Sequence, residues 1–86
     1  MYEVLVEASA AKGLRRLPKE DLARIARELR GLTEDARPAG SRKIVGSADA
    51  YRIRVGDYRI VYKVDDEQRR VAVQAIGHRK DVYRPR

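Results

Sequence analysis

Apolar and polar side chains alternate along two segments in the second half of the chain, which read YRIRV and YRIVYKV. Alternation with a period of two is typical of β-strands. Gly56 and Asp57 separate the two segments, and such a pair between alternating runs favours a two-residue hairpin turn. The pairs expected from this turn are Val55 with Tyr58, Arg54 with Arg59, Ile53 with Ile60, Arg52 with Val61, and Tyr51 with Tyr62.

The expected register sorts the hairpin side chains onto the two faces of a sheet, because successive residues of a strand point in opposite directions. The apolar face, suited to packing under a helix, carries Tyr51, Ile53, Val55, Tyr58, Ile60 and Tyr62. The opposite face, which we call the cationic face, carries Arg52, Arg54, Arg59 and Lys63 together with Val61. The pattern therefore predicts a sheet with one core side and one positively charged side.

The first half of the chain predicts one strand followed by a helical hairpin. Alternation over Tyr2–Glu7 indicates a short strand with one apolar face. Ser9 is expected to cap a helix that ends near Leu17, and Pro18 suits the first turn of a second helix. Apolar residues recur in this second helix at steps of three and four, so that one side of it can pack against a sheet. They are Leu22, Ile25, Ala26, Leu29 and Leu32.

The remaining segments predict a loop and a further strand. Turn-forming residues punctuate Thr33–Ala50, where we expect a loop with one short extended piece at Lys43–Val45. A four-residue turn at Asp65–Gln68 leads into a last strand from Arg69 to about Gly77. The pairs expected from this turn are Tyr62 with Val71, Val61 with Ala72, Ile60 with Val73, and Arg59 with Gln74.

These elements predict one α+β domain that spans residues 1–86. A strand, a helical hairpin and an antiparallel three-stranded meander would form one small twisted sheet with the helices on one face. Val71, Val73 and Ala75 would extend the core, and Gln74 would join the cationic face beside Arg59.

Composition narrows the chemistry available to this domain. The chain has no cysteine and a single histidine, so we expect no disulfide, no thiolate nucleophile, no metal site and no cofactor. No window approaches the roughly 18 apolar residues of a membrane span, and no secretory leader is evident. We therefore expect a cytoplasmic protein that does not contact membranes.

The formal net charge of +7 lies mostly in the second half of the chain. Residues 1–40 carry eight basic and seven acidic side chains, whereas residues 41–86 carry twelve basic and six acidic ones. A compact basic half attracts polyanions through phosphate contacts and counterion release, which makes nucleic acid the first partner to consider. A solvated surface that keeps the protein soluble is the alternative explanation of the same charge.

The cationic face is a candidate anion site. Arg54 directly opposite Arg59 is unfavourable by roughly 0.2–1 kcal/mol, because like charges on neighbouring strands repel each other. Arg52, Lys63 and Gln74 would extend the site, and we assign these three residues to RNA or phosphate binding. The alternative is that long arginine side chains spread into solvent over an exposed sheet.

The C-terminal segment HRKDVYRPR supplies further candidates. Arg79 stands at the exit of the last strand, and we assign its neighbours His78 and Lys80 to RNA binding. Tyr83 lies in the polar sequence DVYR, where an exposed ring can stack on a nucleobase. The alternatives are a Tyr83 ring folded against the edge of the core and a His78 that is merely solvated.

Two motifs in this half resemble the RelE toxins of the RelE and ParE superfamily of toxin–antitoxin systems. They are YRIRVGDYRIVYKV over Tyr51–Val64 and IGHRKDVY over Ile76–Tyr83, preceded by a strand and a helical hairpin in the order that the family uses. The resemblance implies the toxin of a type II system, an endoribonuclease that cleaves mRNA in the A site of the 70S ribosome and so inhibits translation. It also implies a RelB-like antitoxin that wraps over the toxin and inactivates it.

The resemblance implies roles for individual residues. The family's cations on the sheet correspond to Arg52, Arg54 and Arg59, and its tail residues correspond to Arg79 and Tyr83. The implied reaction is metal-independent attack of a ribose 2′-hydroxyl on the adjacent phosphate, with Arg54 among the catalytic residues. Arg59 and Arg79 would stabilise the charge of the phosphorane, and Tyr83 would hold the base.

The chain departs from the family pattern at the general base. Some members have lysines in place of Arg52 and Arg54, and lysine can lose its proton when its pKa is lowered, whereas arginine stays protonated. His78 and Tyr83 are the only obvious titrating candidates. Two other functions are compatible with the sequence: ParE-like inhibition of DNA gyrase, which does not need the arginine site, and RNA binding without catalysis.

Overall fold

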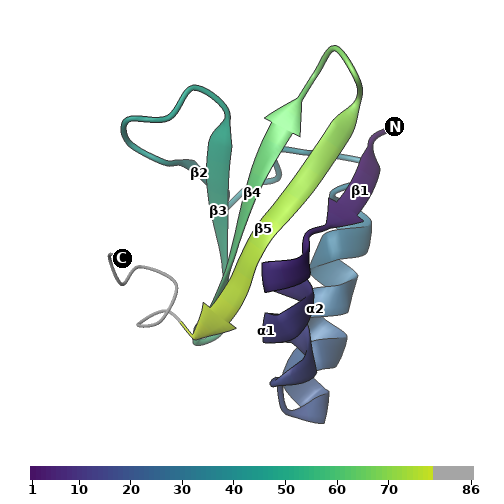
Figure 1. Ribbon diagram of the computed structural model, residues 1–86, viewed down its shortest axis with the longest axis vertical. Helices are drawn as coiled ribbons and strands as arrows, with labels where there is room; N and C mark the ends of the chain where they lie inside the picture. The colour runs from purple at the N-terminus through teal and green to yellow at the C-terminus, as the bar shows by residue number, and fades with distance from the viewer. Residues whose placement is uncertain (79–86) are drawn as a thin grey trace.

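The computed structural model describes residues 1–78, which form a five-stranded sheet with two helices packed against it (Figure 1). The strands lie in the order β1-β5-β4-β3-β2, with β1 parallel to β5 and the other neighbours antiparallel. The expected α+β class is confirmed, and the sheet gains a short edge strand, β2. The elements are β1 (Glu3–Val6), α1 (Ala8–Arg15), α2 (Lys19–Gly31), β2 (Arg42–Lys43), β3 (Ala50–Val55), β4 (Tyr58–Asp65) and β5 (Arg70–His78).

The β3–β4 hairpin has the register that the sequence predicts. Arg54 lies opposite Arg59 and Tyr51 lies opposite Tyr62, and the three other expected pairs also form. Gly56 begins the turn with a φ of 60°, a left-handed conformation that glycine adopts without steric cost. The apolar face and the cationic face of this hairpin are therefore confirmed.

The pairing of β4 with β5 differs from the predicted register. The turn occupies residues 66–69, one position later than expected, and Asp65 becomes the last residue of β4. The Asp65 carboxylate accepts a hydrogen bond from the Gln68 backbone amide at 3.0 Å, which closes the turn in this position. Tyr62 consequently pairs with Val73, two residues beyond the expected partner.

A β-bulge shifts the register of these two strands once more, between Val61 and Tyr62. The extra residue on β5 is Gln74, which has no partner on β4 in the strand register. Arg59 therefore lies opposite Gly77, and the expected pairing of Arg59 with Gln74 was wrong.

The core lies between the apolar face of the sheet and the two helices. Val71 and Val73 are fully buried, as expected, but Ile76 takes the core position predicted for Ala75. Because of the bulge, Ala75 pairs with Val61 on the cationic face. The core side chains are Ala10, Ile25, Leu32, Ala36, Ile53, Ile60, Tyr62, Val64, Val71, Val73 and Ile76.

The helical hairpin follows the predicted order but begins differently. The N-cap residue of α1 is Glu7, and the Ser9 hydroxyl instead donates a hydrogen bond to the carbonyl oxygen of Gln74 at 2.5 Å. Ser9 thus ties α1 to the bulge of β5, and its expected role as a cap was wrong. Pro18 is the N-cap of α2. Neither helix in the described part of the chain is long and apolar enough to cross a membrane.

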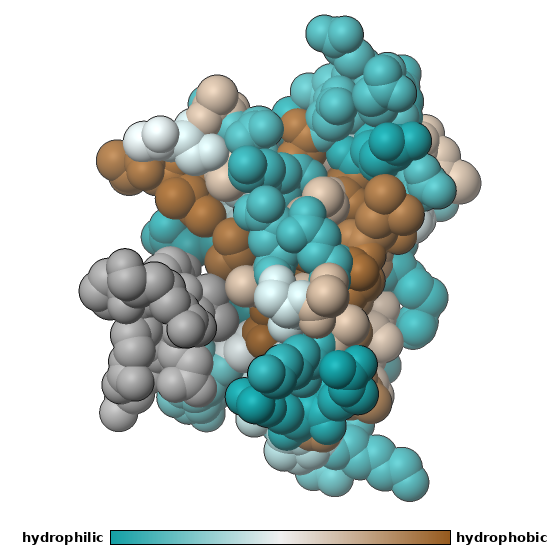
Figure 2. Space-filling view, viewed as in Figure 1, coloured by the Kyte–Doolittle hydropathy of each residue, from teal (hydrophilic) through white to brown (hydrophobic). Residues whose placement is uncertain are grey.

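The short strand β2 begins one residue earlier than the extended piece expected at Lys43–Val45. It pairs with β3, with Arg42 opposite Arg52. The loop from β2 to β3 forms the apolar projection at the left of Figure 2, and Val45 in this loop is 96% exposed. β2 is thus an edge strand held by two residue pairs.

Candidate functional site

Four arginines line an open pocket of about 430 Å³ on the cationic face. Arg52, Arg54 and Arg59 were expected there, and the structure brings all three together. Arg42 and the backbone of Gly40 complete the lining. We call this hollow the arginine pocket. Its place follows from the alternation of β3 and β4, which sends every second side chain to the face opposite the helices.

Strand pairing concentrates positive charge in the arginine pocket. Arg54 faces Arg59 across β3 and β4, and Arg42 faces Arg52 across β2 and β3. No acidic residue among those described lines the pocket. Like charges in directly opposed positions destabilise the sheet, whereas an anion held between them would relieve the repulsion. Guanidinium groups match the geometry of phosphate oxygens, so a phosphodiester is the ligand class that this pocket fits best.

The Arg59 side chain is less exposed than those of Arg42 and Arg54 in the same pocket. It lies in the middle of the sheet, between Arg54 on β3 and Gly77 on β5. Its side chain is half-buried, and the Nε atom is shielded from solvent. Partial burial leaves a side chain fewer conformations to lose on binding, which suits Arg59 to a preorganised role.

Arg42 is the pocket residue that the sequence analysis missed. It lies in a segment expected to be a loop, and no periodic pattern surrounds it. Its place in the pocket depends on the pairing of Arg42 with Arg52 across two strands. The available signal was the basic pair Arg42 and Lys43 in the segment before the hairpin. The sequence alone does not show which face of the sheet either side chain occupies, because that depends on the register of β2.

Lys63 and Gln74, assigned to the same site, do not line the arginine pocket. Lys63 is on the cationic face but lies four residues along β4 from Arg59, which corresponds to roughly 13 Å in a strand. Gln74 is the bulge residue of β5, and its carbonyl oxygen accepts the hydrogen bond from Ser9. The Gln74 assignment depended on the register that the bulge changed, whereas Lys63 is excluded by its distance along β4.

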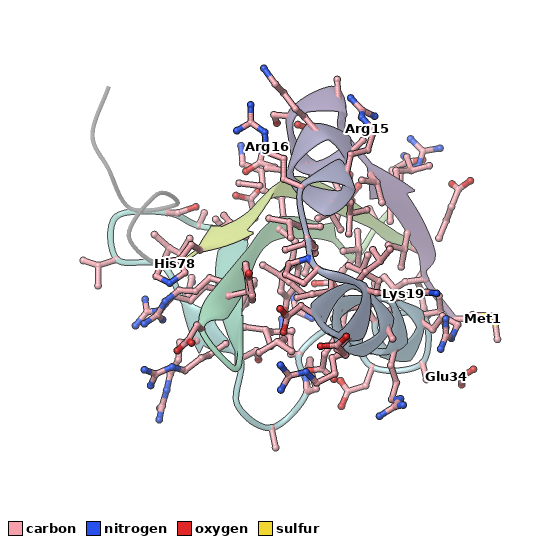
Figure 3. The ribbon with its side chains drawn as sticks, turned by 90° about the horizontal axis from the view of Figure 1, so that it is seen from below. Met1, Arg15, Arg16, Lys19, Glu34 and His78 are labelled. Atoms are coloured by element: carbon pink, nitrogen blue, oxygen red, sulfur yellow. The ribbon has the colours of Figure 1, made fainter. Side chains whose placement is uncertain are left out.

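His78 lies on the other side of the sheet. It pairs with Tyr58, and the two rings meet edge to face with centroids 5.9 Å apart. Both residues line a second hollow of about 280 Å³ together with Arg16 of α1, and Figure 3 shows Arg16 and His78 at this end of the molecule. The structure therefore separates His78 from the arginine pocket. Arg79, Lys80 and Tyr83 lie outside the described residues.

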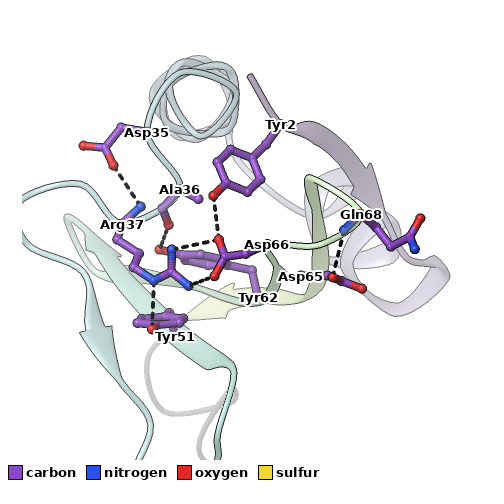
Figure 4. Close-up of polar contacts among 9 residues, drawn as sticks. All are labelled: Tyr2, Asp35, Ala36, Arg37, Tyr51, Tyr62, Asp65, Asp66 and Gln68. Atoms are coloured by element: carbon purple, nitrogen blue, oxygen red, sulfur yellow. Dashed lines mark hydrogen bonds and ion pairs between the residues drawn. The ribbon is translucent and has the colours of Figure 1, made fainter.

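A polar network joins the far end of the sheet to the segment before β2 (Figure 4). Arg37 binds both carboxylate oxygens of Asp66, at 2.8 and 3.2 Å, and its Nε donates to the Tyr51 hydroxyl at 2.9 Å. The Tyr2 hydroxyl also donates to Asp66, at 2.6 Å. The hydrogen bond from Arg37, followed by that from Tyr2, lowers the pKa of Asp66 from 3.8 to about 2.

This shift predicts how acid weakens the fold. The pKa of Asp66 is lower in the folded protein than in the unfolded chain. The ionised carboxylate therefore stabilises the fold at pH values above the pKa of the unfolded chain, and this contribution is lost as the pH falls through the folded pKa of about 2. Asp66→Asn should therefore lower the urea midpoint at neutral pH, and the difference from wild type should shrink between about pH 4 and pH 2. A difference that stayed constant down to pH 2 would contradict this assignment. The measurement is urea unfolding at a series of pH values.

No group of three or more His, Cys, Asp or Glu side chains within residues 1–78 is arranged to hold a metal ion.

The sequence as a whole matches known toxins. Residues 4–83 match the family described as the ParE toxin of type II toxin–antitoxin systems, parDE. Toxin RelG of Mycobacterium tuberculosis is 32% identical over 96% of this chain and 97% of its own length. A putative RelE-like toxin protein of Escherichia coli is 35% identical over 95% of this chain and 90% of its own length.

Solved structures show the same fold. The isolated RelE toxin of Escherichia coli superposes with a TM-score of 0.81 at 30% identity, over 96% of this chain and 92% of that chain. The archaeal RelE–RelB complex from Pyrococcus horikoshii also gives a TM-score of 0.81, at 28% identity, over 91% of this chain and 94% of that chain. The similarity therefore extends over sequence, length and tertiary structure.

Proposed function

Because the chain belongs to the ParE toxin family of type II toxin–antitoxin systems, as a RelE-like toxin of the RelE/ParE superfamily, we propose that it is a ribosome-dependent endoribonuclease. It cleaves mRNA in the A site of the 70S ribosome and thereby stops translation. The observation that carries the proposal is the arginine pocket, where three arginines expected from the sequence and Arg42 line one hollow.

The positive charge of the arginine pocket suits a reaction in which negative charge develops on a phosphate group. In the proposed step a ribose 2′-oxygen attacks the adjacent phosphorus, the bond from phosphorus to the 5′-oxygen breaks, and a 2′,3′-cyclic phosphate and a 5′-hydroxyl result. The 2′-hydroxyl loses a proton and the 5′-oxygen gains one. Negative charge increases on the phosphorane oxygens, and Arg59, with Arg54 opposite it, supplies fixed donors at that point.

Arg52 and Arg42 bind neighbouring phosphates in this proposal. They form the other opposed pair of the pocket and lie nearer the sheet edge than Arg59. Phosphate contacts of this kind orient the strand without reading its bases. Orientation lowers the barrier because the 2′-oxygen must attack in line with the leaving 5′-oxygen.

Proton transfer is assigned to groups other than those lining the arginine pocket. Arginine side chains stay protonated at ordinary pH, and His78 faces the helix side of the sheet beside Tyr58. Of the two titrating candidates from the sequence, only Tyr83, which lies outside the described residues, is left for this role. We propose that the enzyme works without a metal ion, by charge stabilisation and positioning.

We propose a RelB-like antitoxin as the partner that silences the toxin in the cytoplasm. The similar archaeal RelE was solved as a complex with RelB. The net charge of +7 and the arginine pocket suit an acidic antitoxin segment, which would neutralise the same groups that bind RNA.

Purified protein added to a translating ribosome mixture tests the function. Primer extension on the mRNA should reveal new 5′ ends at A-site codons, only when ribosomes are present. Arg79→Ala and Tyr83→Phe should weaken these ends, whereas Arg27→Ala, at an exposed position on α2 outside the pocket, should leave them unchanged. Intact mRNA in a mixture that contains folded protein and translating ribosomes would refute the nuclease.

Inhibition of DNA gyrase is the second candidate function, and the name of the matching family favours it. Gyrase supercoiling assays with the same protein preparation separate the two. The nuclease proposal expects unchanged supercoiling and cleaved mRNA, while a gyrase inhibitor expects the reverse. A protein that binds RNA but neither cleaves mRNA nor inhibits supercoiling would have the third function, that of a non-catalytic RNA-binding module.

A further inference from the structure

One wall of the arginine pocket is carried by the segment that joins α2 to β2. Gly40 in this segment lines the pocket, and Arg42, two residues later, is the first residue of β2 and lines it as well. The Ser41 amide donates to the Pro38 carbonyl oxygen at 2.9 Å, and Gly40 has a φ of 98°, so residues 38–41 form a tight turn. The position of Arg42 therefore depends on where the chain is fixed just before this turn.

Strand pairing by itself holds Arg42 weakly. β2 has only two residues, and one of its two pairs sets Arg42 opposite Arg52. The repulsion between these charges works against the pairing. After β2 the chain is held by the Ile44 amide, which donates to the Ala50 carbonyl oxygen at 2.9 Å, so the side left to fix is the one before Arg42.

The support lies at Arg37, one residue before the turn. Its guanidinium binds Asp66 of the β4–β5 turn through two hydrogen bonds and donates a third to Tyr51 of β3 (Figure 4). Next to it, the buried Tyr62 hydroxyl donates to the Ala36 carbonyl oxygen at 2.9 Å. An isolated exposed ion pair contributes little, but this one is bidentate and shares its groups with further partners.

We propose that Arg37 and Asp66, with Tyr51, form a clamp that positions Arg42 as a fourth phosphate-binding residue of the arginine pocket. The clamp fixes one end of the turn at residues 38–41, and Arg42 emerges from the other end into the pocket. The inference rests on the proposed function, because it takes RNA phosphate as the ligand. Arg37 and Asp66 act through Arg42 and do not line the pocket themselves.

A double-mutant cycle measures the coupling between the clamp and the pocket. The probe is a short fluorescent single-stranded RNA with methylated 2′-hydroxyls, which binds but cannot be cleaved. Arg42→Ala should weaken binding about tenfold, the factor for one charge-assisted hydrogen bond, and should reduce the salt slope by about 0.7. Asp66→Asn should weaken binding about threefold, and in its background the effect of Arg42→Ala should fall from about tenfold to about threefold.

Asp65→Asn is the matched control. It removes the same charge from the neighbouring residue, which contacts the Gln68 amide and not Arg37. Both Asp→Asn changes make the protein more positive. If long-range electrostatics were the only effect, both variants would bind RNA more tightly. The clamp predicts opposite signs: tighter or unchanged binding for Asp65→Asn and weaker binding for Asp66→Asn. Tyr51→Phe, which removes one acceptor of Arg37 and changes no charge, should also weaken binding.

The outcomes are distinct. Equal effects of Arg42→Ala in wild type and in Asp66→Asn, with all variants folded by circular dichroism, would overturn the clamp while leaving the nuclease intact. Coupling observed in a protein that does not cleave mRNA would support the clamp and refute the nuclease. A wild-type protein that binds the RNA no better than the Arg42→Ala variant would overturn the assignment of Arg42 and the clamp together.

Discussion

Replacing Arg59 with alanine is expected to lower the rate of mRNA cleavage by about 10²- to 10³-fold, the usual effect of removing one preorganised donor to a charged transition state. Arg59 is half-buried on β4, opposite Arg54 and next to β5, and its Nε atom is shielded from solvent. Water that entered in its place would lack the charge and the fixed donors of the guanidinium. The rate should be measured under single turnover on mRNA in stalled ribosomes, so that binding and cleavage are separated.

Arg59→Lys tests whether charge alone is sufficient. Lysine keeps the charge but lacks the planar fork of donors, so we expect it to recover only part of the lost rate. The exposed Arg27→Ala is the control for loss of a positive charge far from the pocket, and it should cleave at the wild-type rate. If Arg59→Ala and Arg27→Ala cleave at the same rate, the pocket is not the catalytic site.

Gly13→Ala is expected to lower the free energy of unfolding by about 1–3 kcal/mol, which is the range for overpacking a tightly packed core. The usual expectation for glycine to alanine in a helix is the opposite, a gain of up to about 1 kcal/mol from helix propensity. Here α1 approaches β5 so closely that a Cβ at position 13 would collide with the backbone carbonyl oxygen of Ile76. The helix would have to move away from the strand, because backbone atoms cannot yield as a flexible side chain does.

Gly31→Ala is the matched control for this prediction. Gly31 is the last residue of α2, and a Cβ there would meet no atom within 4 Å. We expect this variant to be as stable as wild type or slightly more stable. Urea unfolding of both variants decides the point: equal stability of Gly13→Ala and Gly31→Ala would show that α1 and β5 are less closely packed than the structure indicates.

The cationic face of the sheet was predictable because it depends on local features. Gly56 and Asp57 fix the hairpin turn, and a period of two then assigns each neighbouring side chain to a face. Arg52, Arg54 and Arg59 follow from that turn without any knowledge of the tertiary structure. All three consequently line the pocket as the sequence predicts.

The register of β5 was not predictable in the same way. The sequence DDEQRR allows a turn at more than one position, and the Asp65 carboxylate closes the later one. The bulge at Gln74 then receives the Ser9 hydroxyl, which comes from a helix 65 residues away in the chain. The alternation along β5 does not reveal the bulge, because the carbonyl oxygen of the extra residue is bound by a side chain of α1.

The class of fold, the hairpin and the positive charge of one sheet face could be predicted from the sequence, because each depends on residues close together in the chain. The tertiary structure decided which positive charges form one site. Arg42 joins the site because β2 pairs with β3 and because the segment before β2 is hydrogen-bonded at Arg37. His78 is excluded from the site because it lies on the opposite side of the sheet. Such placements depend on pairings between distant segments, where a shift of one residue moves a side chain to the other face.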